Sequence, residues 1–237
     1  MNVELLKKMK LIGLIGGISW ESTQEYYRLI NEYVNAELGG YHSANCVIYS
    51  LDFQTIHSLQ EEENWAAIAT YILNITSKLI GAGVDLLVIC SNTIHIIAEE
   101  IEQRITIPFV HIADATGNEI KNTGCSTVGL LGTIFTMEKE FYRNRLSKYK
   151  IQTIIPNRTE REVIQQIIFS ELVFGQIKDS SRERVLNIIA NLKSRGAEGI
   201  VLGCTELPLL IQNIGNLPLF NTTAIHARAA VNLALEV

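Results

Sequence analysis

Short apolar runs alternate along the chain with longer stretches in which apolar and polar residues recur at helical spacing. The apolar runs have the length and composition of strands that are buried on both faces of a parallel sheet. The predicted strands span residues 11–15, 45–50, 84–90, 109–111, 127–131, 151–155 and 200–203. The clearest amphipathic helices are predicted near residues 21–38, 64–80, 138–149, 160–174 and 182–194. Strands and helices in alternation predict an α/β fold built on parallel sheets.

Three segments of the first half recur in the second half in the same order. Residues 10–17, KLIGLIGG, align without a gap on residues 126–133, STVGLLGT, at an offset of 116 residues. The other two pairs, at offsets of 115 and 113 residues, are 25–28 with 140–143 and 83–93 with 196–206. Ordered matches at a nearly constant offset indicate an internal duplication.

The duplication predicts two similar α/β lobes, each with a parallel four-stranded sheet. Residues 1–112 together with residues 208–237 are predicted to form the first lobe, and residues 113–207 the second. Ligands of open α/β sheets bind at the carboxyl ends of the strands, so we expect the active site in a cleft between the lobes.

Composition and charge narrow the choice of partner to a small molecule. Among 237 residues, 20 Lys and Arg stand against 25 Asp and Glu, which gives a net charge of −5 without a basic run. This balance argues against nucleic acid and against an anionic membrane surface. No segment approaches the roughly 20 apolar residues of a membrane span, and residues 1–17 lack the pattern of a signal segment. We therefore expect a cytoplasmic protein.

The third repeated pair aligns Ser91 with Cys204, and each of these residues ends a strand and opens a helix. At such a position unpaired helix N–H groups favour an anion. The pKa of the Cys204 thiol is therefore predicted to be lowered, which makes Cys204 the foremost candidate for a nucleophile or base. The alternative is a small buried core residue, the common use of a free cysteine.

Polar residues at the other strand ends suit a carboxylate ligand. Asn92 and Thr93 offer an amide and a hydroxyl, although the same residue types also cap helices. Gly17, after the first strand, lets the backbone approach a ligand, or serves only a tight turn. Thr133 and Thr136 occupy the equivalent turn in the second lobe.

Metal and nucleotide sites are not predicted. The four cysteines form no C-x-x-C pair, and the five histidines lack the spacing of a metal site. The turn after the first strand lacks the glycine patterns that cradle nucleotide phosphates. His95, four residues after Ser91, is interpreted as a structural hydrogen-bonding residue that would also tune the cleft.

Five segments, taken in order, resemble the aspartate/glutamate racemase family of cofactor-independent amino-acid racemases. They are GLIGGISWEST, SNTIH, HIADAT, LLGTIFTME and GCTE, which begin at Gly13, Ser91, His111, Leu130 and Gly203. The likeness covers nearly the whole chain and is nearest to the broad-specificity branch of the family. It implies a two-lobed, homodimeric isomerase that racemises an amino acid without pyridoxal phosphate.

In this family two opposed cysteines exchange the α-proton: one removes it and the other delivers a proton to the opposite face. By resemblance the second cysteine is Cys204, whereas Ser91 stands in place of the first. A serine hydroxyl is a much weaker acid than a thiol, so we predict an asymmetric pair. Cys204 would deprotonate one enantiomer, by analogy the L form, and Ser91 or a water that it holds would reprotonate the opposite face.

The resemblance also assigns the residues around this pair. Glu206 follows the second cysteine position as a supporting residue. The substrate carboxylate would be bound by Asn92, Thr93, Thr205 and a threonine of the turn that holds Thr133 and Thr136.

The residues after the second strand bear on the side chain of the substrate. Aspartate-directed members tend to place an arginine after the aspartate at this point, whereas this chain has Asp52-Phe53. Without that cation an acidic side chain loses a bidentate partner, while Gln60 would bind a carboxylate or an amide through neutral hydrogen bonds. Aspartate, glutamate or a broader set of L-amino acids is therefore expected.

Two other functions fit the same residues. One is a carboxylate isomerase or decarboxylase that needs a single cysteine as proton donor, and the other is a non-catalytic amino-acid-binding protein. The presence of Cys204 favours the enzymatic alternatives over binding alone.

Overall fold

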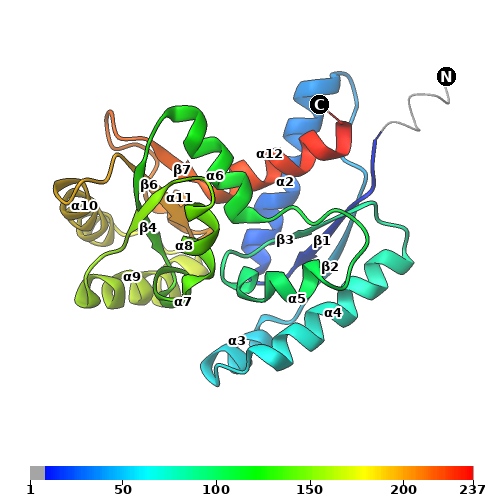
Figure 1. Cartoon of the computed structure of the whole chain (residues 1–237), viewed down its shortest axis with the longest axis horizontal. Coiled ribbons are helices and arrows are strands. Elements are labelled where there is room, and N and C mark those ends of the chain that lie inside the picture. Colours follow the sequence, from blue (N-terminus) through cyan, green and yellow to red (C-terminus); the bar gives the residue numbers. More distant parts are fainter. Residues whose placement is uncertain (1–8, 237) are drawn as a thin grey trace. The chain divides into compact units, whose positions relative to one another are not determined.

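The computed structural model describes residues 9–236, which divide into two compact units (Figure 1). The first unit holds residues 9–111 and 226–236, and the second holds Ile112–Ile225. Residues 1–8 and Val237 lie outside the described residues. The first eight belong to the segment 1–17, in which the sequence predicts no signal pattern. Among residues 9–236 no helix has the length and apolar character needed to cross a membrane.

The first unit is built on a parallel sheet with the strand order β2-β1-β3. Its strands are β1 (Ile12–Gly16), β2 (Cys46–Ser50) and β3 (Leu86–Ile89). Every residue of β1 and of β3 is buried, as expected for apolar strands of a parallel sheet that is covered on both faces.

The fourth strand predicted for this sheet, at residues 109–111, is wrong. Phe109 makes only an isolated bridge to Leu87, and helix α6 (Ile112–Thr123) begins directly afterwards. The segment is therefore too short to form a ladder, and the sheet has three strands within the described residues.

Helices follow the strands of the first unit. They are α2 (Trp20–Leu38), α3 (Phe53–Glu61), α4 (Trp65–Gly81), the 3-10 helix η1 (Thr93–Ile97) and α5 (Ala98–Glu102). On α4, Ile68, Ile72 and Ile75 recur at helical spacing. They pack with Ile15 and Ile89 of the sheet, so α4 covers one of its faces.

The second unit is built on a parallel sheet with the order β5-β4-β6-β7. Its strands are β4 (Thr127–Gly132), β5 (Gln152–Ile154), β6 (Gly199–Gly203) and β7 (Leu219–Asn221). The sequence did not predict β7, because Pro218 interrupts the short apolar run at residues 217–220 in which this strand begins.

Strand β7 also moves the boundary between the units. It pairs with β6 from Ile200 opposite Leu219 to Leu202 opposite Asn221, and this pairing holds it in the second unit. The chain therefore returns to the first unit after Ile225, and the predicted boundary between residues 207 and 208 is wrong.

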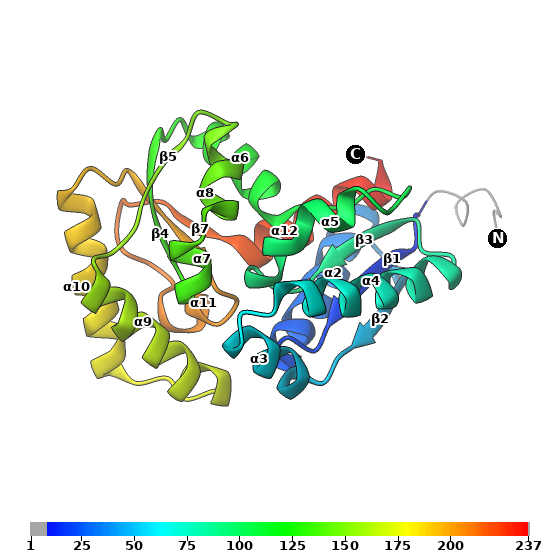
Figure 2. The ribbon, with the colours of Figure 1, turned by 60° about the horizontal axis from the view of Figure 1, so that its bottom comes forward.

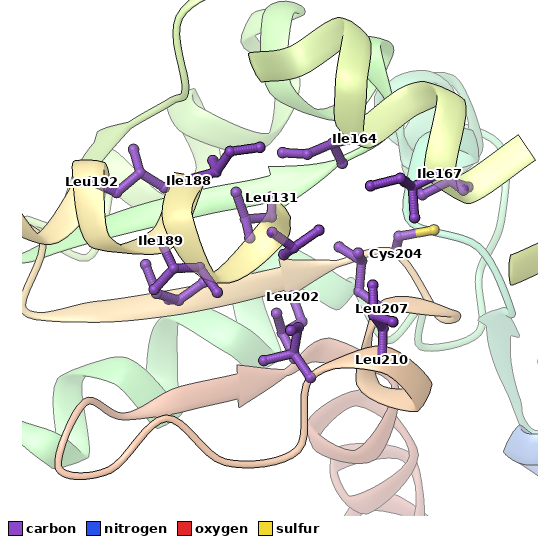
Figure 3. Close-up of a cluster of buried hydrophobic side chains, with 14 of the residues drawn as sticks. Leu131, Ile164, Ile167, Ile188, Ile189, Leu192, Leu202, Cys204, Leu207 and Leu210 are labelled. Carbon is purple, nitrogen blue, oxygen red and sulfur yellow. The ribbon is translucent and has the colours of Figure 1, made fainter. Parts of the chain in front are cut away.

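Helices of the second unit pack on the two faces of its sheet (Figure 2). Besides α6, the second unit holds α7 (Ile134–Glu138), α8 (Glu140–Ser147), α9 (Arg158–Ser170), η2 (Leu172–Phe174), α10 (Asp179–Ser194) and α11 (Leu207–Leu210). Helix α12 (Thr222–Leu235) begins in the second unit and belongs to the first unit from His226 onward. Leu131 of β4 packs with Ile164 of α9 and Ile188 of α10 (Figure 3). Its neighbour Leu130 packs with Tyr142 of α8, because successive residues of a strand point to opposite faces.

The two units share the order of their equivalent strands. The order β2-β1-β3 in the first unit corresponds to β5-β4-β6 in the second. The first repeated sequence block lies on β1 and β4, and the third lies on β3 and β6. The prediction of an α/β fold with two parallel sheets is confirmed, with three and four strands rather than four in each.

Candidate active site

The predicted site residues form two groups, one in each unit. The first unit holds Gly17, Asp52, Gln60, Ser91, Asn92, Thr93 and His95. The second unit holds Thr133, Thr136, Cys204, Thr205 and Glu206. Most of them stand at or just after the carboxyl end of a strand, where open α/β sheets bind ligands.

Ser91 stands in a tight turn between β3 and η1. Its N–H donates to the Ile89 carbonyl at 2.8 Å, and its carbonyl accepts a hydrogen bond from Nδ1 of His95 at 2.7 Å. Ser91, Asn92 and Thr93 are all buried, and Ser91 is 7% exposed. The side chain of Asn92 does not cap the helix that follows, so the capping interpretation fails for this residue.

Gly17 serves a tight turn, the simpler of its two interpretations. Its φ is +82°, and a Cβ at this position would lie 2.2 Å from the Leu51 carbonyl oxygen. Its N–H already donates to Oγ1 of Thr23 at 2.7 Å. Glycine is therefore required here by the close approach of the chain that leaves β2.

Asp52 and Gln60 lie at opposite ends of α3. Asp52 caps this helix, because Oδ1 accepts from the Gln54 N–H and Oδ2 accepts from the Thr55 hydroxyl, both at 3.3 Å. Gln60 is only 7% exposed, and its side-chain amide makes no hydrogen bond within residues 9–236. Asp52 thus has a structural task, whereas the amide of Gln60 retains its hydrogen-bonding capacity.

In the second unit two glycines bring the ends of β4 and β6 together. Gly132 pairs with Gly203, and a Cβ on Gly132 would lie 2.7 Å from the Gly203 carbonyl oxygen. Thr133 caps α7 by accepting a hydrogen bond from the Thr136 N–H, and the two hydroxyl oxygens are 3.2 Å apart. The two threonine hydroxyls therefore lie in the turn after β4, beside β6, which ends directly before Cys204.

The thiol of Cys204 is held by the carboxylate of Glu206. Sγ of Cys204 donates to Oε2 of Glu206 at 2.9 Å, and the Thr205 hydroxyl donates to the same oxygen at 2.7 Å. Cys204 is 7% exposed at the edge of a hydrophobic cluster, and its sulfur points away from Leu131 and Leu202 (Figure 3).

Burial, and then the Glu206 carboxylate beside it, raise the pKa of the Cys204 thiol well above its usual value. The predicted lowering of this pKa is therefore wrong for the ligand-free protein. The helix that follows, α11, has only four residues, and a full negative charge stands in contact with the sulfur. The resting group is a thiol with a proton acceptor in place.

The remaining cysteines offer no comparable chemistry. Cys90 is fully buried, and burial raises the pKa of its thiol. Cys46 and Cys125 are partly buried, and all four cysteines are free. In the part of the chain that the structure describes, no three His, Cys, Asp or Glu side chains are grouped so that they could hold a metal ion.

Sequence reasoning missed three buried polar residues in the first unit: Tyr26, His111 and His226. The Tyr26 hydroxyl lies 2.8 Å from Nδ1 of His226, and the His111 ring contacts that of His95. No short motif joins the three positions; His111 opens the HIADAT segment, whereas Tyr26 and His226 carried no separate signal in the sequence.

Comparison with known proteins identifies the family. The Asp/Glu/hydantoin racemase family matches residues 15–230. The broad specificity amino-acid racemase RacX of Bacillus subtilis (strain 168) is 24% identical over 231 residues, which cover 95% of this chain and 98% of that protein.

Solved structures agree along the whole length. A proposed Asp/Glu racemase from Yersinia pestis is 47% identical with a TM-score of 0.89, over 96% of this chain and 100% of that one. An aspartate racemase homologue from Pyrococcus horikoshii OT3 is 35% identical with a TM-score of 0.84, over 95% of this chain and 99% of that one. The chain therefore belongs to the Asp/Glu/hydantoin racemase family, and it is an isomerase of the amino-acid racemase class.

Proposed function

We propose that the protein racemises its amino-acid substrate with Cys204 as the base on one face of Cα and Ser91 as the proton donor on the other. The observation that carries the proposal is the Cys204–Glu206 hydrogen bond at the end of β6, at the position that matches Ser91 at the end of β3. A thiol that contacts a carboxylate can be converted to a thiolate inside the site, and a thiolate is an effective base.

The protons balance around these groups. The thiol proton of Cys204 passes to the Glu206 carboxylate, and the thiolate then takes the α-proton of the bound amino acid. The Ser91 hydroxyl gives its proton to the opposite face of the carbanion and regains one from water. Glu206 returns its proton to solvent, which neutralises the hydroxide, so the cycle ends with every group in its starting form.

The substrate carboxylate is proposed to bind the polar groups beside these two residues. The Thr133 and Thr136 hydroxyls and Thr205 serve it in the second unit. Asn92 and Thr93, which directly follow Ser91, serve it in the first unit. Hydroxyl and amide donors of this kind bind a carboxylate without a metal or a buried cation.

The pair is asymmetric, and the asymmetry is kinetic. Ser91 can deliver a proton but supplies no resting alkoxide, so the enantiomer that presents its α-proton to Cys204 exchanges that proton with solvent faster. By family analogy this is the L form. In deuterium oxide, proton NMR is expected to show rapid loss of the α-proton signal from the L substrate and slow loss from the D substrate. Faster exchange of the D substrate would reject this assignment.

The cysteine assignment is tested with a matched thiol variant. Cys204→Ala is expected to abolish exchange from the L substrate, whereas Cys125→Ser, which also removes a thiol from the second unit, is expected to retain it. Product analysis of the wild-type reaction separates racemisation from the alternatives. Loss of carbon dioxide would favour a decarboxylase, and ligand binding without any exchange would favour a binding protein.

Gln60 is proposed to contact the substrate side chain and to favour glutamate or a broad set of amino acids over strict aspartate specificity. Its buried amide retains its hydrogen-bonding capacity, and no arginine follows Asp52. A panel of L-amino acids assayed by α-proton exchange tests the range. Gln60→Ala is expected to raise KM for glutamate more than KM for alanine, and equal effects would remove Gln60 from the substrate site.

We further propose a homodimer that works in the cytoplasm without pyridoxal phosphate. The family resemblance supports all three properties, and four free cysteines accord with a reducing compartment. Light scattering is expected to give twice the mass of one chain, and cell fractionation is expected to place the protein in the cytoplasm. Activity is expected to survive hydroxylamine treatment and dialysis, which remove pyridoxal phosphate.

A further inference from the structure

Three buried histidines meet in the first unit, although they are far apart in the sequence. His95 belongs to η1, His111 directly precedes α6, and His226 lies on α12. The centroid of the His95 ring is 4.8 Å from that of His111 and 5.5 Å from that of His226, both in edge arrangements. The Phe109 ring stacks on the His95 ring, with centroids 5.4 Å apart and an interplanar angle of 18°.

The hydrogen bonds of His226 define its protonation. Nε2 is 2.7 Å from the Val110 carbonyl oxygen, which can only accept, so Nε2 carries a proton. Nδ1 is 2.8 Å from the hydroxyl of Tyr26, which donates to it when the ring is neutral. Burial lowers the pKa of His226 to about 4, so the neutral ring with a single tautomer is the form present near neutral pH. Both ring nitrogens of His226 are thus held by hydrogen bonds, and its ring packs in a fixed orientation against the ring of His95.

The hydrogen bond of His95 reaches the backbone of Ser91. Its Nδ1 lies 2.7 Å from the Ser91 carbonyl oxygen, so Nδ1–H is the donor. The N–H of Ser91 donates to the Ile89 carbonyl at 2.8 Å. The peptide groups on both sides of Ser91 are thus held, which constrains φ and ψ of this residue. The location of its Oγ then depends only on the side-chain torsion.

Packing alone does not account for this arrangement. A buried imidazole must have its ring N–H groups satisfied, and an apolar side chain would fill the same volume without that cost. His95 is 1% exposed, and its Nδ1–H donates to the backbone carbonyl of Ser91. Ser91 is the residue of this turn that the proposed reaction uses as an acid.

We propose that His95, held by the rings of Phe109, His111 and His226, is a positioning residue that aligns the Ser91 hydroxyl for proton delivery to the substrate. The inference rests on the proposed role of Ser91. It predicts that His95 affects the step made by Ser91 and leaves the step made by Cys204 in place.

Two rates separate these steps. Exchange of the L substrate with deuterium needs only Cys204, since its thiol can trade the abstracted proton for a solvent deuteron and return that deuteron to the same face of Cα. Formation of the D product also needs delivery from Ser91. The ratio of D-product formation to L-substrate exchange therefore reports the positioning of Ser91, and a purely structural residue would lower both rates together.

The matched variants are His95→Asn and His95→Gln. The Asn amide places its N–H near the position of Nδ1, whereas the Gln amide places it near that of Nε2. Both retain a polar amide and leave a gap in the cluster. We expect His95→Asn to keep the ratio close to that of the wild type and His95→Gln to lower it at least about tenfold, since small misplacements of a reacting group cost this much or more. His95→Leu, which has no donor, is expected to behave like His95→Gln.

The outcomes distinguish this inference from the proposed function. Equal ratios in wild type, His95→Gln and His95→Leu would overturn the positioning role. Absence of Cys204-dependent exchange in the wild type would instead overturn the proposed function. If His95→Leu does not fold, the comparison of His95→Asn with His95→Gln decides, with thermal unfolding as the measure that the two are equally folded.

Discussion

Sγ of Cys204 donates a hydrogen bond to Oε2 of Glu206 over 2.9 Å, and the Thr205 hydroxyl donates to the same oxygen over 2.7 Å. The carboxylate therefore has two effects on the thiol. It adds to burial, the larger cause, in raising the pKa of Cys204, which keeps the thiol protonated in the ligand-free protein, and it is the acceptor to which the thiol proton can pass. In the proposed mechanism the thiolate therefore forms only during the reaction, and a permanently reactive thiolate is avoided.

Replacement of the carboxylate should separate these two effects. In Glu206→Gln the negative charge is lost, so the pKa of Cys204 is expected to fall while the acceptor for its proton disappears. We expect kcat/KM to fall about 100-fold, a typical contribution of a positioned acid or base. The rate of alkylation by iodoacetamide against pH measures the change in pKa.

A background without the partly buried thiols makes this measurement specific. Cys46→Ser and Cys125→Ser remove them, and Cys90 is fully buried. An unchanged alkylation profile together with unchanged kcat/KM would show that Glu206 neither shifts the pKa of Cys204 nor accepts its proton.

Ser91→Cys restores a thiol at the first catalytic position. A thiol forms a base near neutral pH far more readily than a hydroxyl, so the D-to-L rate is expected to rise at least about tenfold. Because the two free enantiomers are equally stable, kcat/KM of the L-to-D direction is expected to rise by the same factor, whereas α-proton exchange is expected to accelerate more for the D substrate than for the L substrate. Initial rates from each pure enantiomer, followed by circular dichroism, give both values. A folded variant without any gain would contradict the two-base mechanism.

His226 makes the first unit sensitive to acid. Its pKa is about 4 in the folded protein, below the ordinary value of about 6.5, so the unfolded chain binds more protons between these values. Stability is therefore highest above pH 6.5 and falls as the pH drops toward 4. Protonation of this residue alone is expected to lower the free energy of unfolding by about 2 kcal/mol between pH 7 and pH 5.

The measurement compares urea unfolding of wild type and His226→Gln at both pH values. The variant retains a donor near Nε2 for the Val110 carbonyl but loses the Nδ1 acceptor of the Tyr26 hydroxyl, so it is expected to be less stable at pH 7, while its stability should change less with pH. Parallel pH dependences in the two proteins would mean that His226 does not titrate in this way.

Gly17→Ala should be far more damaging than another glycine substitution with similar backbone geometry. An added Cβ would lie 2.2 Å from the Leu51 carbonyl oxygen, and φ is +82°. Gly39 has φ of +70° with no atom within 4 Å of an added Cβ, so Gly39→Ala carries only the backbone strain. We expect the free energy of unfolding, measured with denaturant, to fall by about 1–3 kcal/mol in Gly39→Ala and by more than this in Gly17→Ala, where the steric clash adds to the strain. Equal losses would refute the steric explanation.

The internal repeat explains why much of the fold, and the placement of Ser91 and Cys204 at equivalent strand ends, could be predicted. The blocks at 10–17 and 126–133 mark the central strands, and the block that aligns Ser91 with Cys204 marks the ends of β3 and β6. Apolar runs of this kind show their burial directly in the sequence, because both faces of a parallel strand are covered. Strand β7 escaped prediction because Pro218 interrupts the short apolar run in which it begins.

The sequence by itself therefore determined the two α/β units, the equivalence of Ser91 and Cys204, and the family. Only the tertiary structure decided the protonation of Cys204 and the setting of Ser91. The pKa of a thiol depends on where the Glu206 carboxylate points, and the Ser91 backbone depends on a histidine cluster assembled from residues 95, 111 and 226. Electrostatic and hydrogen-bonding energies fall off within a few ångströms, so they follow distances in space, which the order of residues along the chain does not contain.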